Sequence, residues 1–168
     1  VQELTVEIKK PILLDGDGIT AISKKPESAK KRKAETIITP HMGEMARLAG
    51  INIRELKGNK IAILRELSKE LNAIIVLKGA HSLIGYPDET TYINMSGNSG
   101  MATAGSGDIL TGTIAGMTGQ GLTLKDAVRT GVFIHGLSGD LAAADKGEDG
   151  ITAQDIMDYL PASIKLYR

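Results

Sequence analysis

The residues best suited to chemistry lie in a glycine-rich stretch, residues 94–121, whose second half has the apolar spacing of a helix. Glycine lets backbone N–H groups approach a ligand closely and adopts positive φ without steric cost. The helical spacing begins near Ser106, which places Gly105 and Gly107 at a helix N-terminus. Unpaired amides and the positive end of the helix dipole favour an anion there, typically phosphate.

Asp108 falls in the first turn of this predicted helix. An aspartate in that position usually caps the helix or pairs with its dipole. Alternatively, its carboxylate could take a proton from a substrate hydroxyl while that oxygen attacks a phosphate held by the neighbouring amides. No Lys-Ser or Lys-Thr follows Gly107, as a P-loop requires, and Leu110 stands where a dinucleotide fingerprint needs a third glycine. The pattern therefore predicts a nucleotide or phosphate loop of undetermined type.

Residues 98–108, NSGMATAGSGD, with the following Leu110-Thr-Gly and Gly119-Gln-Gly, resemble the signature of the ADP/ATP-dependent NAD(P)H-hydrate dehydratases, a branch of the ribokinase-like superfamily. The resemblance implies that Asp108 is catalytic and contacts the substrate. It also implies that the loop binds an adenine nucleotide through Asn98, Ser99, Gly100, Met101, Ala102, Thr103, Ala104, Gly105, Ser106 and Gly107. Ala104 departs from the family, which commonly has glycine there, and could change loop flexibility without removing an N–H donor.

The composition is that of an ordinary soluble globular domain, large enough to bury a core. The chain has 168 residues, 42% hydrophobic and 24% charged, with zero formal net charge and no cysteine. This length predicts a single domain, residues 1–168. The neutral balance gives no indication of nucleic acid or an anionic membrane as a partner. Neither a signal peptide nor an apolar run of membrane-spanning length is recognisable, so we expect a cytoplasmic protein.

Short apolar runs alternate with helical patterns through the first half of the chain. Buried strands are predicted at residues 11–14, 35–39 and 73–77, with an amphipathic helix over 59–71 covering the sheet. Residues 83–84 and 90–95 predict a hairpin. The alternation indicates an α/β domain with a central, largely parallel sheet flanked by helices. The resemblance further implies the three-layer ribokinase-like arrangement.

Two charged segments precede the second strand. Asp15 and Asp17 follow the first strand, and turn or cap chemistry is the favoured interpretation for both. The resembling family has a similar Asp-x-Asp near its substrate, which keeps a functional role open. Residues 24–33, KKPESAKKRK, are basic but carry no aromatic residues for base stacking, so a solvated face is predicted.

His41 and Glu44 follow the second predicted strand, at the carboxyl edge where open α/β sheets bind ligands. A lone histidine in a turn is more often a local hydrogen-bonding residue, and Glu44 could simply favour the helix start. Residues 39–48, TPHMGEMARL, resemble the substrate-side motif of the dehydratase family. By that resemblance His41 contacts the hydrated nicotinamide nucleotide, and Glu44 is a weaker candidate for arranging water around Mg²⁺.

A lysine and a glycine follow the third predicted strand. Lys78 could be a solvated strand end, yet a lysine point charge with an adjacent glycine also suits phosphate. In the resembling family this segment belongs to the adenine nucleotide site, which implies nucleotide contacts from Lys78, Gly79, Ala80, His81 and Ser82.

The last third of the chain is predicted to be helical. Helices are expected from residue 106, over 124–144, and from a cap at Thr152 to an end near Pro161. Gly112, Gly116 and Gly131 would let two of these helices approach closely. His135 is predicted to be a core histidine and not a ligand.

The resemblance implies ADP-dependent dehydration of hydrated NADH or NADPH, by phosphorylation of the hydrate hydroxyl and elimination of phosphate, with ADP or ATP and Mg²⁺. Family domains begin about a hundred residues earlier, a large gap for one domain. The chain therefore resembles a C-terminal portion, and we expect a homo-oligomer or association with a chain that supplies the missing N-terminal part. Two alternatives stay open: an ATP-dependent kinase of a vitamin precursor, and an inactive nucleotide-binding fragment.

Overall fold

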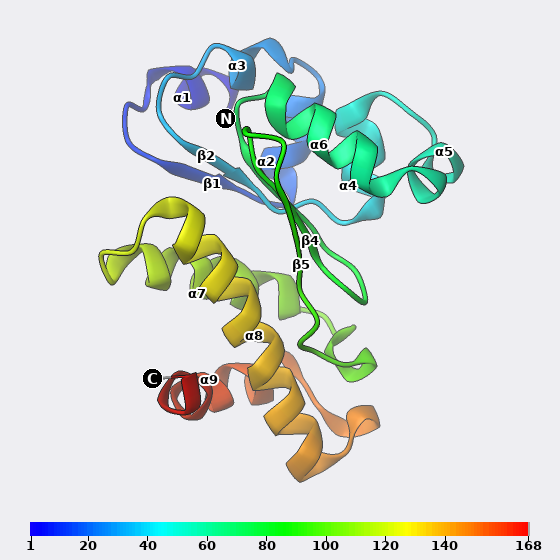
Figure 1. Cartoon of the computed structure of the whole chain (residues 1–168), viewed down its shortest axis with the longest axis vertical. Helices are drawn as coiled ribbons and strands as arrows, with labels where there is room; N and C mark the ends of the chain where they lie inside the picture. The colour runs from blue at the N-terminus through cyan, green and yellow to red at the C-terminus, as the bar shows by residue number, and fades with distance from the viewer. Residues whose placement is uncertain (168) are drawn as a thin grey trace. The chain divides into compact units, whose positions relative to one another are not determined.

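The computed structural model describes residues 1–167 and divides the chain into two compact units (Figure 1). The first unit is Val1–Ile93, and the second begins at Asn94. Each unit has its own packing and is described by itself. The single domain expected over residues 1–168 stays a prediction.

The first unit alternates strands and helices. Its helices are α1 (Gln2–Glu7), α2 (Asp17–Ser23), α3 (Glu27–Lys30), α4 (Met42–Ala49), α5 (Ile53–Gly58) and α6 (Lys60–Glu70). Its strands are β1 (Ile12–Leu14), β2 (Thr36–Ile38), β3 (Ile74–Leu77), β4 (Leu83–Gly85) and β5 (Thr91–Ile93). The strands predicted from apolar runs are therefore all present, and α1 is an element that was not predicted.

A five-stranded sheet of order β1-β2-β3-β4-β5 organises this unit. Strands β1, β2 and β3 run parallel, with Leu13 opposite Ile37 and Ile38 opposite Ile75. Strands β3, β4 and β5 are antiparallel neighbours, as the predicted hairpin requires. Because β1 to β3 are parallel, their carboxyl ends meet at one edge of the sheet.

The core of the unit lies between the sheet and its helices. Ile38 and Ile75 of the sheet, Met45 of α4 and Leu64 of α6 are completely buried in one apolar cluster. Gly85 of β4 allows α6 to lie close, because a Cβ there would be 2.7 Å from Leu64 Cγ and 2.5 Å from Ser68 Oγ. This packing holds α6 on β3 and β4 (Figure 1).

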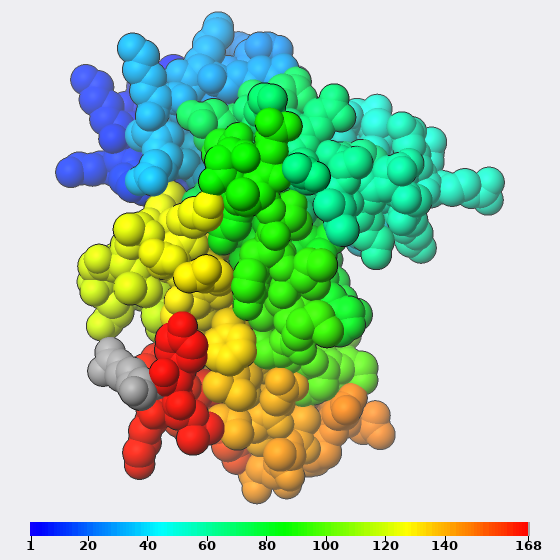
Figure 2. Space-filling view, in the orientation of Figure 1, coloured from blue at the N-terminus to red at the C-terminus, as the bar shows by residue number. Residues whose placement is uncertain are grey.

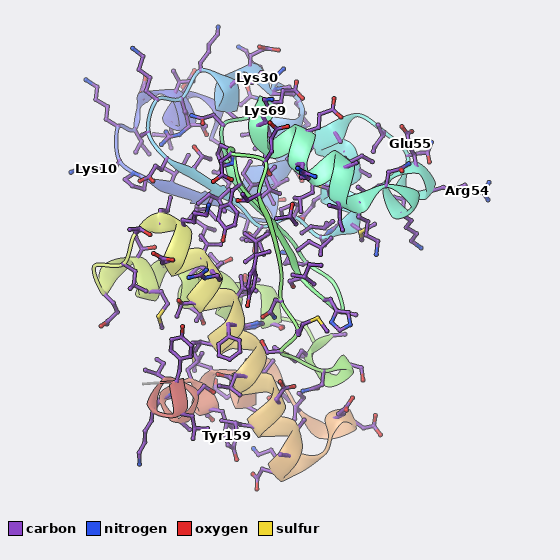
Figure 3. All side chains as sticks on the ribbon, in the orientation of Figure 1. Lys10, Lys30, Arg54, Glu55, Lys69 and Tyr159 are labelled. Carbon is purple, nitrogen blue, oxygen red and sulfur yellow. The ribbon has the colours of Figure 1, made fainter. Side chains whose placement is uncertain are left out.

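The basic run 24–33 is only partly the solvated face that was predicted. Lys30 projects outward and pairs with Glu70 at 2.6 Å (Figure 3). Arg32, by contrast, is buried and donates to the carbonyls of Thr5, Ile8 and Lys10. The prediction was wrong for this residue, because Arg32 satisfies carbonyls of the α1 segment and so fastens that segment to β2.

The second unit is helical. Its elements are the 3₁₀ turn η1 (Ser99–Met101), α7 (Ser106–Gly119), α8 (Leu124–Lys146), the 3₁₀ turn η2 (Glu148–Gly150) and α9 (Ala153–Tyr167). Helix α8 packs against both α7 and α9 (Figure 1). In residues 1–167 no helix is long and apolar enough to cross a membrane.

Helix α9 begins as predicted but does not end near Pro161. Thr152 and Asp155 cap it reciprocally: the Asp155 amide donates to Thr152 Oγ1 at 3.3 Å and the Thr152 amide donates to Asp155 Oδ2 at 2.8 Å. The helix continues through the exposed Pro161 because later residues pack on α8. Ser163 bonds Ser138 at 3.0 Å, and the Tyr167 ring lies 5.4 Å from Phe133.

One of the three glycines predicted to bring helices together does so. A Cβ on Gly131 of α8 would lie 2.9 Å from Ile114 Cα of α7. Gly112 and Gly116 have nothing within 4 Å of the Cβ position, so the prediction was wrong for both. The backbones of α7 and α8 therefore meet at a single small residue, with the other two glycines on faces that do not touch α8.

Candidate functional site

The carboxyl ends of the three parallel strands bring polar residues together at one edge of the first unit. Asp15 follows β1 and Lys78 follows β3, and their side chains pair at 2.8 Å between Oδ1 and Nζ. The turn after β2 is tied to both neighbours, since the Thr39 amide donates to Leu14 O and the Lys78 amide donates to Pro40 O. Parallel register therefore assembles this edge from segments far apart in the sequence.

The electrostatics of this edge centre on Asp15. Burial raises the pKa of its carboxyl group, but Lys78, through a hydrogen bond and its charge, and hydrogen bonds from Thr39 and Gly16 outweigh burial and hold that pKa below its usual value. Asp15 is consequently ionised and holds the Lys78 ammonium at the sheet edge. From the sequence, a role in the turn was the favoured interpretation for Asp15. In the structure, the parallel order of β1, β2 and β3 brings Asp15 to Lys78, and the two side chains form an ion pair.

Lys78 to Ser82 form the loop of the β3–β4 hairpin. Leu77 and Leu83 are paired across it, and Gly79, Ala80 and His81 are exposed. The loop therefore presents backbone and side-chain donors at the same edge as Lys78. The nucleotide contacts expected of this segment stay a prediction.

His41 and Glu44 form a capping box at the start of α4. His41 Nδ1 accepts from the amides of Gly43 at 3.0 Å and Glu44 at 3.2 Å, and Glu44 Oε2 accepts from the His41 amide at 2.8 Å. Because Nδ1 accepts, the ring carries its proton on Nε2. The His41 side chain is 57% exposed. It can therefore offer Nε2–H to a ligand acceptor, so the local role and the predicted substrate contact are compatible.

Glu44 is buried and engaged by the cap, with Oε1 3.6 Å from His41 Nε2. Residues 1–167 contain no group of three or more His, Asp or Glu side chains placed to hold a metal ion. Mg²⁺ prefers one or two carboxylates together with substrate phosphates over an all-protein cage. Glu44, as a single carboxylate that arranges water around an ion held by substrate phosphates, is compatible with that mode. The described residues do not fit a metal site built from side chains alone.

The glycine-rich segment of the second unit has the backbone that its sequence predicts. Gly97 has φ +102° and Gly105 has φ +89°, a region that disfavours residues with a side chain. Asn98 caps η1, with Oδ1 accepting from the Gly100 amide at 3.0 Å. The loop is thus a chain of tight turns that ends at Gly105, the N-cap of α7.

The first turn of α7 has no side-chain cap, so Asp108 does not cap the helix, while its place in the first turn agrees with the alternative role as a partner of the helix dipole. Asp108 is exposed in that turn. Two amides of the turn are already engaged, Ser106 with Thr103 O at 3.3 Å and Asp108 with Gly105 O at 3.0 Å. An anion at the start of α7 would therefore accept from fewer free amides than the sequence suggested. It would also lie at the positive end of the helix dipole and beside the exposed Asp108 carboxylate.

The side chain of His135 of α8 contacts the first residue of α7. It is 8% exposed, and its Nε2 lies 3.0 Å from Ser106 O. Burial lowers the pKa of His135 to about 4, against a smaller opposite effect of the hydrogen bond to Ser106. The neutral ring therefore donates Nε2–H to the carbonyl, which confirms the predicted core histidine.

Sequence reasoning missed two carboxylates that contact the loop. Asp140 of α8 accepts from the Gly97 amide and from Asn98, and Glu148 of η2 accepts from the Ser99 hydroxyl. The contact between the loop and η2 is visible where the green and orange segments meet in Figure 2. The available signal was an aspartate among small residues, Gly136-Leu-Ser-Gly-Asp140.

The first unit has an α/β sheet with a lysine at the carboxyl end of one strand. The second unit has a helix that begins in a glycine loop. Both features are common in folds that bind phosphate groups. A solved structure of hydroxyethylthiazole kinase from Pyrococcus horikoshii shares the fold at a TM-score of 0.69 and 16% identity, covering 95% of this chain. This likeness concerns architecture alone.

The family model described as NAD(P)H-hydrate dehydratase matches residues 1–162. The chain therefore belongs to the NAD(P)H-hydrate dehydratase family, and the predicted family and ribokinase-like fold are confirmed. It is 48% identical over 168 residues to the bifunctional NAD(P)H-hydrate repair enzyme of Thermofilum pendens, covering 100% of this chain and 32% of that protein. It is 36% identical to the ADP-dependent (S)-NAD(P)H-hydrate dehydratase of Neisseria meningitidis, covering 86% of this chain and 49% of that protein.

A solved ADP/ATP-dependent NAD(P)H-hydrate dehydratase from Bacillus subtilis, co-crystallised with ATP/Mg²⁺, superposes with a TM-score of 0.86. The two chains are 31% identical, and the match covers 97% of this chain and 57% of that one. The chain thus spans between a third and somewhat over half of the length of these relatives.

Proposed function

We propose that this chain carries the nucleotide site of an ADP-dependent NAD(P)H-hydrate dehydratase. The observation that carries the proposal is the family match over residues 1–162 together with a glycine loop ending at an uncapped helix start that exposes Asp108. The substrates are hydrated NADH or NADPH and an adenine nucleotide. We further propose that the reaction takes place in the cytoplasm.

In this proposal the terminal phosphate of ADP lies at the start of α7. In the second unit the proposed nucleotide contacts are the loop residues Asn98 to Gly107. In the first unit they are Lys78 to Ser82, with Lys78 as a point charge for phosphate. His41 donates Nε2–H to the hydrated nicotinamide nucleotide. These assignments rest on the exposure of the two loops and of the His41 ring.

Asp108 acts as the general base. Its carboxylate takes the proton of the hydrate hydroxyl while that oxygen attacks the terminal phosphorus, and the bond from phosphorus to the bridging oxygen of ADP breaks to release AMP. Phosphate then leaves the ring carbon as the adjacent ring carbon loses a proton, which restores the dihydronicotinamide double bond. Mg²⁺ would neutralise phosphate charge during transfer, with Glu44 as the candidate residue for arranging water around the ion.

The match to the Bacillus subtilis structure covers 57% of that chain, and β1 is an outer strand of the sheet with a partner on one side. An outer parallel strand can accept a further strand. We therefore propose that further polypeptide, from the same or another chain or in a homo-oligomer, completes the substrate pocket.

The test is recovery of NADH absorbance from its hydrate with Mg²⁺ and either ADP or ATP. We expect ADP-dependent recovery, lost by at least about a hundredfold in Asp108→Asn because a general base is removed. The matched control is Asp158→Asn, which removes an exposed carboxylate on α9 that bonds only Gln154 among the described contacts. Full turnover in Asp108→Asn would refute the assignment of the base.

The same assay separates the alternatives. A kinase of a vitamin precursor would prefer ATP and release a stable phosphorylated product, and the shared fold with hydroxyethylthiazole kinase is the observation behind this candidate. An inactive fragment would bind ADP with no recovery of NADH at any nucleotide concentration.

A further inference from the structure

One carboxylate of helix α8 holds the start of the glycine-rich loop. The Gly97 amide donates to Asp140 Oδ2 at 2.8 Å, and Asn98 Nδ2 donates to Asp140 Oδ1 at 3.0 Å. Both carboxylate oxygens are thus engaged by consecutive residues of the loop. Hydrogen bonds to an ionised acceptor are about twice as strong as neutral ones.

The geometry around Asn98 requires an acceptor at position 140. Asn98 Oδ1 accepts from the Gly100 amide at 3.0 Å, so the side-chain amide cannot flip without losing that bond. Its Nδ2 group must then face Asp140, and the Gly97 amide faces it as well. The Gly97 amide and Asn98 Nδ2 thus each donate to a different oxygen of residue 140. A carboxylate has two acceptor oxygens for these donors, whereas a side-chain amide has one.

The face of α8 beside Asp140 is shaped to receive the loop. A Cβ on Gly136 would lie 2.2 Å from Ser96 Oγ and 2.7 Å from the Ser96 carbonyl carbon. A Cβ on Gly139 would lie 2.2 Å from Met101 Sδ. The loop backbone therefore lies directly on the helix, at a distance that only glycine permits at position 136.

The opposite side of the loop is confined by η2. A Cβ on Gly100 would lie 2.2 Å from Glu148 O, and the Ser99 hydroxyl donates to the Glu148 carboxylate. The 97–101 segment is thus enclosed between α8 and η2, although Gly97 has positive φ and Gly100 is a second glycine with high backbone freedom. Without such contacts, a segment of this composition would lose substantial conformational entropy on binding a ligand.

From these contacts we infer that Asp140 is a positioning residue for adenine-nucleotide binding. It fixes Gly97 and Asn98 on α8 before the nucleotide arrives, so that binding costs less ordering of the loop. The inference deepens the proposed function and rests on it for the identity of the nucleotide. Because Asp140 acts through the loop, its loss changes nucleotide affinity much more than turnover at saturation.

The experiment compares four forms of the full chain: unaltered, Asp140→Ala, the Asn98→Asp/Asp140→Asn exchange, and Asp145→Ala as control. Asp145 lies on the same helix but accepts from Tyr159 of α9 and does not touch the loop. In the exchange variant, residue 140 can accept from the Gly97 amide and donate to the new carboxylate at 98, which still accepts from the Gly100 amide. All these hydrogen bonds are thereby restored, with the negative charge moved from position 140 to position 98.

The first readout is amide hydrogen exchange of residues 96–101 without nucleotide. We expect at least about tenfold faster exchange in Asp140→Ala from loss of two charge-assisted bonds, recovery in the exchange variant, and no change in Asp145→Ala. A purely structural role of Asp140 would instead accelerate exchange throughout α8 and α9. Unchanged exchange at residues 96–101 in Asp140→Ala would overturn the inference.

The second readout is ADP binding by calorimetry, with KM and kcat where turnover is present. We expect the Kd and KM for ADP to rise about 10- to 100-fold in Asp140→Ala, with kcat within about threefold. An unchanged Kd for ADP would overturn the inference. Absence of ADP binding by the unaltered chain would overturn the proposed function, while the exchange readout would still decide whether Asp140 orders the loop.

Discussion

Replacing Gly131 or Gly116 with alanine tests the packing that places the start of α7. Both glycines lie inside helices, where alanine is favoured over glycine by about 0.5–1 kcal/mol. They differ in surroundings, since a Cβ at Gly131 meets Ile114 and a Cβ at Gly116 meets nothing within 4 Å. The same chemical change therefore has opposite expected effects at the two positions.

The magnitudes follow from the distances. At Gly116 the helix preference acts alone, so Gly116→Ala should stabilise the fold by about 0.5–1 kcal/mol. At Gly131 the new methyl would be 2.9 Å from Ile114 Cα and 3.2 Å from Ile114 N, contacts that only a shift of α7 relieves. Overpacking of this kind costs about 1–3 kcal/mol, which leaves a net loss of about 0.5–2 kcal/mol.

The assay is thermal and urea unfolding followed by circular dichroism. For a chain of this length each kcal/mol corresponds to about 2–4 °C in Tm, so the two variants, which differ by about 1–3 kcal/mol, should differ by about 2–12 °C. Equal Tm values, or a Gly131→Ala variant as stable as Gly116→Ala, would refute the claim that Gly131 is the point of close contact between α7 and α8.

Three further predictions concern charged residues. The pKa of His135 is about 4 in the folded state against 6.5 for the free side chain. Between pH 4 and 6.5 the unfolded chain binds a proton that the folded chain does not, so the free energy of unfolding should be about 3 kcal/mol higher above pH 6.5 than at pH 4. Urea unfolding of His135→Gln should show a weaker pH dependence in this window. Lys78→Met should lower stability at neutral pH by about 1–2 kcal/mol, because Asp15 stays ionised without its partner, and the deficit should shrink as acid protonates Asp15; an unchanged pH profile would contradict the pairing. Arg32→Met should increase proteolysis within residues 1–10 and cost about 1.5–3 kcal/mol, whereas the exposed Lys33→Met should not.

Local patterns predicted the strands, the hairpin and the helix that begins at Ser106, because each has a clear period or a glycine at its boundary. They also predicted the exposed glycine loop and the core role of His135. Local patterns could not predict contacts between segments that are distant in the sequence. The pairing of Asp15 with Lys78 depends on parallel strand order, and the burial of Arg32 depends on carbonyls of α1.

The errors have the same origin. Pro161 is a helix breaker by local rules, but contacts of Ser163 and Tyr167 with α8 keep the helix intact beyond it. Gly112 and Gly116 have the spacing of a helix contact, yet α8 meets α7 elsewhere. Asp140 was overlooked because an aspartate on a helix carries no local sign of the amides that converge on it.

The central claim is that the loop ending at α7 presents an adenine nucleotide to a substrate hydroxyl that Asp108 deprotonates. The most direct measurement is recovery of NADH from its hydrate by the chain with Mg²⁺ and ADP, alongside Asp108→Asn and calorimetric ADP binding to both. We expect both forms to bind ADP and the unaltered form alone to recover NADH. Equal recovery by both forms, or recovery without any nucleotide, would contradict the account.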